Sequence, residues 1–208
     1  MATRLLLVRH GQTEWHAENR YAGISDVALT GEGLRQAEAL GAWAGSRTID
    51  AVACSPLSRA RATAAPAAGR LGLVPEVVAG LREVDFGWGE GRTLAEMRVA
   101  DPDAVRAFET DAAAHPLPGS EPPLPAARRG REALRGLAER HPGAVVLVVA
   151  HNSLLRLALC LMLGMDVGGY RRLLPVLDNA AVTEIEVDGE RTGLRSLNVP
   201  TSAFPHAL

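Results

Sequence analysis

Residues 4–11, which read Arg-Leu-Leu-Leu-Val-Arg-His-Gly, decide the fold, because a short apolar run ends there abruptly in polar residues. The run predicts a strand over Arg4–Val8. A valine-rich run over Ala144–Ala150 predicts a buried strand of the parallel type, and it is followed at once by His151. Ligands of open α/β sheets bind beyond the carboxyl ends of the strands, so the polar residues after these two runs predict a shared site.

Strands and helices alternate around these two runs. Further strands are predicted over Asp50–Cys54, Val74–Val78, Val182–Val187 and Gly193–Val199, the last two as a hairpin turning at Asp188-Gly189. Helices are predicted after Thr30 with Leu34, Ala37, Leu40 and Ala44 on one face, after the capping pair Ser55-Pro56, over Leu124–Arg140, and over Leu154–Leu163 with Asn152 as its cap. This alternation predicts an α/β fold, a sandwich with a mostly parallel sheet.

The segment from about residue 84 to 125 interrupts the pattern. Glycines and prolines punctuate it, and only short helices are indicated, around Thr93–Arg98 and Asp103–Thr110. It lacks the apolar periodicity that a separate core would need. We therefore expect one domain over residues 1–208 with an excursion at about 84–125.

Composition narrows the classes of partner. The chain has 22 arginines, no lysine and 24 acidic residues. The resulting net charge of −2 gives no reason to expect binding to nucleic acid or to a membrane surface. Cys54 and Cys160 lie far apart in apolar segments, as small core residues of a reduced protein do. The longest apolar stretch, Leu157–Leu163, is too short to span a bilayer, and no signal peptide is evident. A cytoplasmic protein is expected.

Several polar residues are candidates for an anion site. Arg9 offers a guanidinium fork that matches phosphate oxygens, and Arg59 falls in the first turn expected after the second strand. His151 stands directly before a helix, where free backbone N–H groups attract anions. Glu83 and Asp85 are the candidate proton donors. A single residue of this kind is more often an ordinary surface or strand-end residue than part of a site. Two strand-end histidines in one sheet, however, favour a common pocket.

Taken together, these residues resemble the histidine phosphatase superfamily, also called phosphoglycerate mutase-like proteins. The resemblance is carried by Arg9–Trp15, Leu29–Gly33, Ser55–Ala60, Leu81–Glu83, His151 and Asp178–Ala180. It implies a three-layer α/β/α sandwich with a lid-like excursion, with no metal and no organic cofactor. The segment Phe86–Gly91 is similar to the phosphatase branch of the superfamily, with its tryptophan shifted by one position.

The resemblance also implies catalytic roles. His10 would be the nucleophile that receives the phosphoryl group and forms a phosphohistidine. Arg9, Arg59 and His151 would hold the phosphoryl oxygens and stabilise their charge. Glu83 would protonate the leaving oxygen and then take a proton from the attacking water.

Three positions of the expected phosphate-binding set stand apart from that catalytic group. His16 occupies a position where family members usually carry Asn, and an imidazolium there would donate a charge-assisted hydrogen bond to the phosphoryl group. Asn152, with Ser153, replaces the Gly-Gly pair found after the second histidine in many phosphatases of the family, and narrows the pocket. Gly23 completes the expected set.

The sequence thus predicts a cofactor-independent phosphomonoesterase that acts on a small phosphorylated metabolite through a phosphohistidine. Two alternatives stay open: a phosphoglycerate-type phosphomutase with the same nucleophile, and an inactive module that binds phosphoesters. The expected partner is a small-molecule phosphate ester, with no nucleic acid and no membrane. Assembly into a homodimer is left open.

Overall fold

A single mixed sheet organises the protein in the computed structural model, which describes residues 1–201. Its six strands, in the spatial order β3-β2-β4-β1-β5-β6, are β1 (Thr3–Arg9), β2 (Ala51–Cys54), β3 (Glu76–Val77), β4 (Val145–Ala150), β5 (Val182–Asp188) and β6 (Arg191–Val199). The first four in this order run parallel, and β5 and β6 close the sheet as an antiparallel hairpin.

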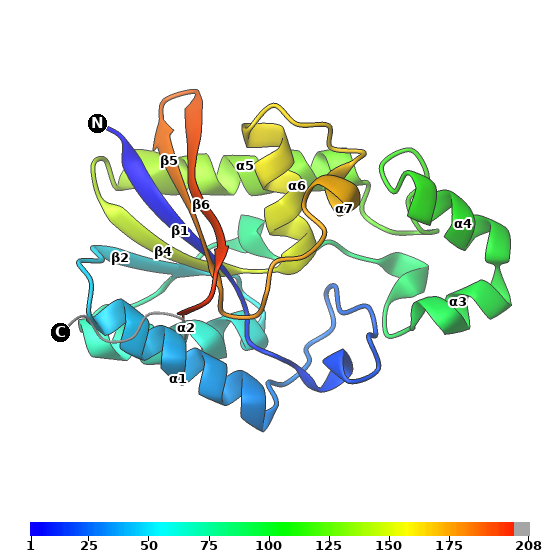
Figure 1. The fold of residues 1–208 in the computed structure, drawn as a ribbon, viewed down its shortest axis with the longest axis horizontal. Coiled ribbons are helices and arrows are strands. Elements are labelled where there is room, and N and C mark those ends of the chain that lie inside the picture. The colour runs from blue at the N-terminus through cyan, green and yellow to red at the C-terminus, as the bar shows by residue number, and fades with distance from the viewer. Residues whose placement is uncertain (202–208) are drawn as a thin grey trace.

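Helices cover both faces of the sheet (Figure 1). The α-helices are α1 (Gly31–Gly45), α2 (Ser58–Leu71), α3 (Leu94–Ala100), α4 (Pro102–Thr110), α5 (Pro123–Arg140), α6 (Asn152–Met162) and α7 (Tyr170–Leu173). Short 3₁₀ turns are η1 (Glu14–His16), η2 (Ala79–Leu81) and η3 (Gly87–Gly89). Helices α1 and α2 lie on one side of the sheet and α5 and α6 on the other, which makes the three-layer sandwich predicted from the sequence.

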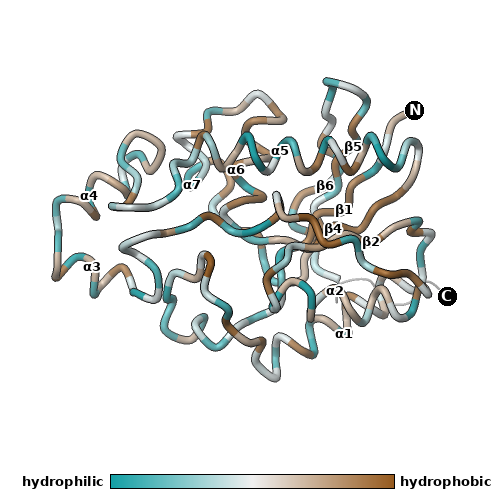
Figure 2. The backbone as a smooth tube through the Cα atoms, turned by 180° about the vertical axis from the view of Figure 1, so that it is seen from behind, coloured by the Kyte–Doolittle hydropathy of each residue, from teal (hydrophilic) through white to brown (hydrophobic). Residues whose placement is uncertain are grey.

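The alternation of side chains along β1 builds a core on each face. Leu5 and Leu7 are buried in the cluster that includes α5 and α6, whereas Leu6 and Val8 are buried with α1 and α2. The central strands are accordingly drawn mostly in the hydrophobic colour in Figure 2. Cys54 and Cys160 are buried free thiols, as predicted. No helix within residues 1–201 is long and apolar enough to cross a membrane.

Most predicted elements are present, but four local predictions were wrong. Leu34 is 54% exposed instead of sharing the buried face of α1, and the third strand is limited to Glu76–Val77, with Val74 in solvent. The pair Ser55-Pro56 does not cap α2, which begins at Ser58. Asn152 does not cap α6 with its side chain but is its first residue. The cap of α1 by Thr30, which accepts a hydrogen bond from Gly33 N, is confirmed.

The excursion contains the two predicted short helices, α3 and α4, and extends beyond one end of the sheet (Figure 1). Its buried side chains, Met97, Val105, Phe108 and Leu117, belong to the same apolar cluster as α5 and α6. Since this segment shares its core with the sandwich, its inner surface is placed firmly over the edge where the parallel strands end.

Candidate active site

The two strand-end histidines meet because β1 and β4 are parallel neighbours. Arg9 pairs in register with Ala150, and His10 N donates to the Ala150 carbonyl over 3.0 Å. The imidazole rings of His10 and His151 are consequently 5.1 Å apart between centroids. Parallel pairing alone therefore assembles the centre that the sequence predicted.

Gly11 lets the loop after β1 press against α1. A Cβ at this position would lie 2.6 Å from the carbonyl oxygen of Gly33, a contact that backbone atoms cannot relieve. Gly11 N donates to Thr63 Oγ1 over 2.9 Å, and that hydroxyl donates to the carbonyl of Arg59 over 2.7 Å. The loop that carries His10 is in this way fixed to both α1 and α2.

His10 is held in one tautomer with one nitrogen free. Its Nδ1 lies 2.7 Å from the carbonyl oxygen of Gly11, which can only accept, so Nδ1 carries the proton and Nε2 keeps a lone pair. The ring is 5% exposed. Burial, with the charges of Arg59 and Arg9, holds the pKa of His10 well below its ordinary value. The imidazole is thus neutral at neutral pH, with a lone pair on Nε2.

His151 lies behind His10 and is fully buried. Its Nε2 is 2.7 Å from Ser55 Oγ, while its Nδ1 has no hydrogen-bond partner among the described residues. Burial and the neighbouring His10 hold the pKa of His151 well below its ordinary value. Ser55 is a residue that the sequence suggested only as a helix cap, and the structure instead gives it the task of orienting this histidine.

Two guanidinium groups flank His10. Arg9 donates through Nη1 to the carbonyl of Leu177 over 2.8 Å, and burial lowers its pKa to about 10. Arg59 is fully buried and donates to the carbonyls of Ser25, Ala22 and Gly23. The Nε atoms of Arg9 and Arg59 have no partner among the described residues.

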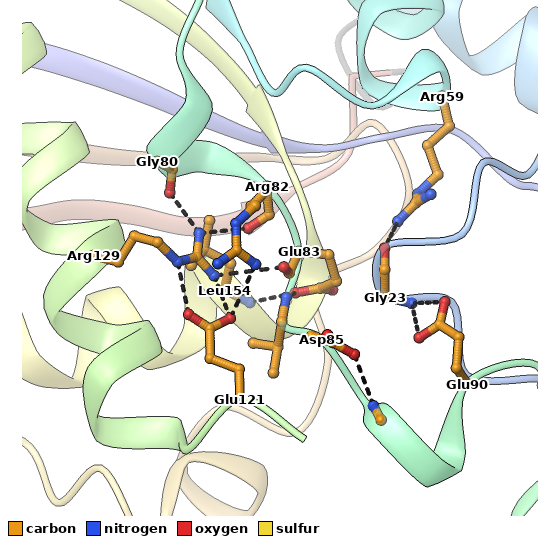
Figure 3. A network of polar contacts seen from close by, with 12 residues as sticks. Gly23, Arg59, Gly80, Arg82, Glu83, Asp85, Glu90, Glu121, Arg129 and Leu154 are labelled. Carbon is orange, nitrogen blue, oxygen red and sulfur yellow. Dashed lines mark hydrogen bonds and ion pairs between the residues drawn. The ribbon is translucent and has the colours of Figure 1, made fainter. Parts of the chain in front are cut away.

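The carboxylate of Glu83 is positioned by the start of α6 (Figure 3). Its Oε1 accepts from Val84 N and Leu154 N over 2.9 and 2.8 Å, and its Oε2 accepts from Ser153 N over 3.0 Å. This carboxylate therefore caps α6, the task that the sequence had suggested for Asn152. Asp85 is placed differently, since its Oδ1 accepts from Gly87 N.

An ion pair behind Glu83 fixes the backbone that carries it. Arg129 of α5 binds Glu121 in a bidentate pair of 2.9 and 2.7 Å and donates through Nη1 to the carbonyls of Gly80 and Arg82, each over 2.8 Å. Figure 3 shows this network beside Glu83. Bidentate guanidinium–carboxylate pairs constrain geometry more than single contacts do, so the loop carrying Glu83 is firmly oriented.

His16 lines the cleft rather than pointing away into solvent. Its Nδ1 accepts from Thr13 N over 3.0 Å, and its Nε2 lies 2.6 Å from Arg9 Nη2. Burial and the charge of Arg9 lower its pKa to about 4. Burial and the neighbouring guanidinium thus disfavour the imidazolium form, through which the sequence suggested a charge-assisted hydrogen bond to the phosphoryl group.

Asn152 and Gly23 contribute mainly to the frame of the site. Asn152 lines the cleft, and its Oδ1 accepts from Leu177 N over 3.1 Å. The N–H of Gly23 donates to the carboxylate of Glu90, and its carbonyl accepts from Arg59, as Figure 3 shows. Phosphate binding by either residue stays a prediction.

A cleft of about 600 Å³ opens over these groups. Arg9, His10, His16, Glu83 and Asn152 line it, whereas Arg59, His151 and Gly23 lie behind its wall.

Two lining residues, Arg156 and Arg171, were missed by the sequence analysis. A lone arginine inside the apolar helix after His151 was a readable signal for Arg156. The sequence holds no comparable signal for Arg171, whose neighbours come from distant segments.

The chain is similar to several phosphatases over nearly its whole length. It is 34% identical to a putative phosphoserine phosphatase 2 of Hydrogenobacter thermophilus, over 94% of this chain and 95% of that protein. A solved mycobacterial glucosyl-3-phosphoglycerate phosphatase superposes with a TM-score of 0.86 at 30% identity, covering 96% of this chain and 100% of the other.

A bifunctional protein of Mycobacterium tuberculosis is 39% identical over 90% of this chain, and the chain spans only about half of it, 51%. The model of the histidine phosphatase superfamily (branch 1) matches residues 5–200. A match of that extent, together with the paired strand-end histidines, makes the chain a member of the histidine phosphatase superfamily.

Proposed function

We propose that the protein is a phosphomonoesterase that hydrolyses a small phosphorylated metabolite through a phosphohistidine on His10, without a cofactor. The observation that carries this proposal is the state of His10, whose Nδ1 is bound to the Gly11 carbonyl and whose Nε2 is free at the floor of the cleft. A neutral imidazole with a free nitrogen can attack phosphorus in line.

In the first half-reaction, His10 Nε2 forms a bond to phosphorus as the ester P–O bond breaks. The leaving alkoxide takes a proton from the carboxyl group of Glu83. The free lone pair for that proton is on Oε2, because Oε1 already accepts two N–H groups and Oε2 only one. Arg9, with Arg59 behind it, offsets the negative charge that the phosphoryl oxygens carry in the transition state.

In the second half-reaction, water takes the place of the leaving alcohol. The carboxylate of Glu83 removes a proton from this water as its oxygen bonds to phosphorus and the N–P bond breaks. Inorganic phosphate and the free imidazole of His10 result, so atoms and charge balance over the cycle. His151 Nδ1 is a buried ring nitrogen without a partner among the described residues, and we expect a phosphoryl oxygen bound at His10 to accept its hydrogen bond.

The relatives support hydrolysis of phosphate esters and leave the substrate to experiment. Those above are named for phosphoserine and for glucosyl-3-phosphoglycerate, and another relative, 31% identical, is named a probable phosphoglycerate mutase of Salmonella. These names differ in the alcohol and agree in the phosphate ester. We therefore propose hydrolysis of a phosphate ester as the reaction and name no single substrate.

The test is a screen of phosphorylated metabolites with purified protein, in which inorganic phosphate and isomerised esters are both measured. We expect stoichiometric phosphate release that is lost in His10→Ala. Accumulation of an isomerised ester without phosphate would identify a mutase. Binding of esters with no turnover of any of them would identify an inactive module.

A further inference from the structure

The walls of the cleft carry more positive charge than phosphoryl transfer uses. Four arginines line it, namely Arg9, Arg20, Arg156 and Arg171. Arg20 is neutralised, since it binds Glu18 over 2.6 Å and Glu96 over 2.8 Å. Glu83 is the remaining carboxylate of the lining. Three arginines, Arg9, Arg156 and Arg171, therefore stand against one carboxylate, and the cleft keeps an excess of positive charge.

Arg156 is a buried cation held by carbonyl oxygens and by the ring of Tyr170, whose centre lies 4.9 Å from its guanidinium carbon. It is 4% exposed, and it donates through Nε to Asn152 O over 3.2 Å and through Nη1 to Leu174 O and Pro175 O over 3.0 and 2.6 Å. Its Nη2 forms no hydrogen bond within residues 1–201. Burial lowers the pKa of Arg156, and its charge contributes to lowering the pKa of Arg9. The charge of Arg156 therefore acts on the phosphoryl end of the cleft.

Arg171 stands further out and is fixed by aromatic side chains. Its Nη1 lies 3.4 Å from Tyr21 Oη, and its guanidinium carbon lies 5.0 Å from the centre of the Phe108 ring. Its charge contributes, after burial, to lowering the pKa of Arg156, as two cations that line one cleft should. Within the part of the chain that the structure describes, neither Arg156 nor Arg171 has a carboxylate oxygen within 4.0 Å.

We propose that Arg156 and Arg171 form a subsite for a second acidic group of the substrate, a carboxylate or a second phosphate, separate from the phosphoryl group that His10 accepts. Two like charges held in place in a partly buried wall repel each other, and an anion between them relieves that repulsion. The proposal rests on the phosphatase function proposed above and specifies the substrate class as an acidic phosphate monoester.

The geometry suits such a ligand. Guanidinium groups match carboxylate and phosphate oxygens with paired N–H donors, and both side chains are oriented before any ligand binds. A cleft of about 600 Å³ accommodates a small metabolite with two charged ends. Because Arg9 and His10 line the same cleft as Arg156 and Arg171, one molecule with two acidic groups can contact both sets of residues.

The experiment compares matched esters. Phosphates of ω-hydroxy acids with two to four carbons are assayed beside their primary amides, and diol bisphosphates beside diol monophosphates. We expect the wild type to prefer the acidic member in kcat/KM by roughly 10- to 150-fold, the range of hydrogen bonds to charged groups. The first pair reports a carboxylate and the second pair a phosphate at the subsite.

Substitution assigns the preference to the two arginines. Arg171→Gln should lose most of it while keeping kcat/KM for the neutral amides. Arg156→Gln should lose it as well, with a smaller loss on the neutral amides, because Arg156 also binds three backbone carbonyls and its charge reaches Arg9. Arg172→Gln is the matched control, because this exposed neighbour does not line the cleft. If Arg156→Gln fails to fold, the kcat/KM values of Arg171→Gln for acidic and neutral esters decide whether the subsite exists. Equal losses on acidic and neutral esters, or no preference in the wild type, would overturn the subsite.

Binding separates the subsite from the proposed reaction. Calorimetry on His10→Ala protein with the same ester pairs should show tighter binding of the acidic member, and Arg171→Gln in that background should abolish the difference. Equal dissociation constants for acid and amide would refute the subsite even if phosphate release is confirmed. A wild type that releases no phosphate from any ester would refute the reaction, while this binding preference would still support the subsite.

Discussion

The two ends of the cleft are built in different ways. At the inner end, His10 and His151 directly follow neighbouring parallel strands, and their positions follow from the pairing of β1 with β4. At the outer end, Arg171 contacts Tyr21, 150 positions away in the chain. The groups proposed for phosphoryl transfer are thus placed by local sequence beside the strands, whereas the proposed subsite depends on long-range packing of connecting segments. Substitutions at the two ends should have distinguishable effects.

The largest effect is expected at the nucleophile. His10→Ala should lower kcat for phosphate release by on the order of 10⁴-fold or more, equally for acidic and neutral esters, because no other group at the floor can carry the phosphoryl group. Rapid quench with a labelled substrate should trap acid-labile, base-stable label on the wild type alone. The exposed His115→Ala serves as the matched control. Substantial activity in His10→Ala would sink the mechanism.

A smaller and substrate-dependent effect is expected at Glu83. Glu83→Gln should slow esters of poor leaving groups by about 10²- to 10³-fold but nitrophenyl phosphate far less, since nitrophenolate leaves without a proton. Asp85→Asn, which changes a carboxylate that binds Gly87 N, should affect both substrates alike and weakly. Equal losses on both substrates in Glu83→Gln would contradict its assignment as proton donor.

Ser55 tests whether the inner end depends on a supporting contact. We expect its hydroxyl to hold His151 with the proton on Nδ1, so Ser55→Ala should lower kcat/KM about tenfold, the value of one buried hydrogen bond. Nitrogen-15 NMR of the histidine rings should show His151 as a mixture of tautomers in the variant and as one tautomer in the wild type. A single tautomer in both proteins would remove Ser55 from this role.

The smallest effect is expected from His16. The pKa of His16 is lowered to about 4, so the ring is neutral from pH 6 upwards, and inhibition by inorganic phosphate should be the same in wild type and His16→Asn there. Below about pH 5 the protonated ring adds positive charge beside Arg9, and the wild type should bind phosphate a few-fold more tightly than the variant. The measurement is the inhibition constant against pH, corrected for ionisation of phosphate. Profiles that coincide down to pH 4 would exclude the role of His16 in phosphate binding.

The same contrast between local and distant contacts explains what the sequence could predict. The apolar run over Arg4–Val8 predicted a strand. Residues directly after a strand lie at the end of the sheet, so the position of His10 could be predicted from the sequence. The charge state of His16 could not be, because its pKa depends on burial in the folded protein and on the approach of Arg9 Nη2 to within 2.6 Å. The predicted burial of Leu34 was wrong for a related reason. Helical spacing identifies the apolar face of a helix but not how wide its buried part is, and Leu34 lies outside that part, in solvent.

The capping of α6 shows a second limit. A polar residue before an apolar helix usually indicates an N-cap, and Asn152 stands at such a position. The carboxylate of Glu83 nevertheless accepts the hydrogen bonds of Ser153 N and Leu154 N. A side chain almost 70 positions away therefore replaced the local candidate. A carboxylate that caps a helix from a distant segment cannot be found from the residues around the helix start, for this reason.

The contacts at the base of the excursion bear on which parts of this segment can change. Glu121 N donates to the Asp85 carbonyl over 2.8 Å, so the segment leaves and returns at one point, and the pair Glu121–Arg129 clamps that point to α5. These contacts hold the two ends of the segment together without any residue between them. We expect changes in the length of the segment to leave the hydrogen bonds of Glu83 in place and to reshape the part of the cleft wall that Thr93, Leu94 and Ala95 form.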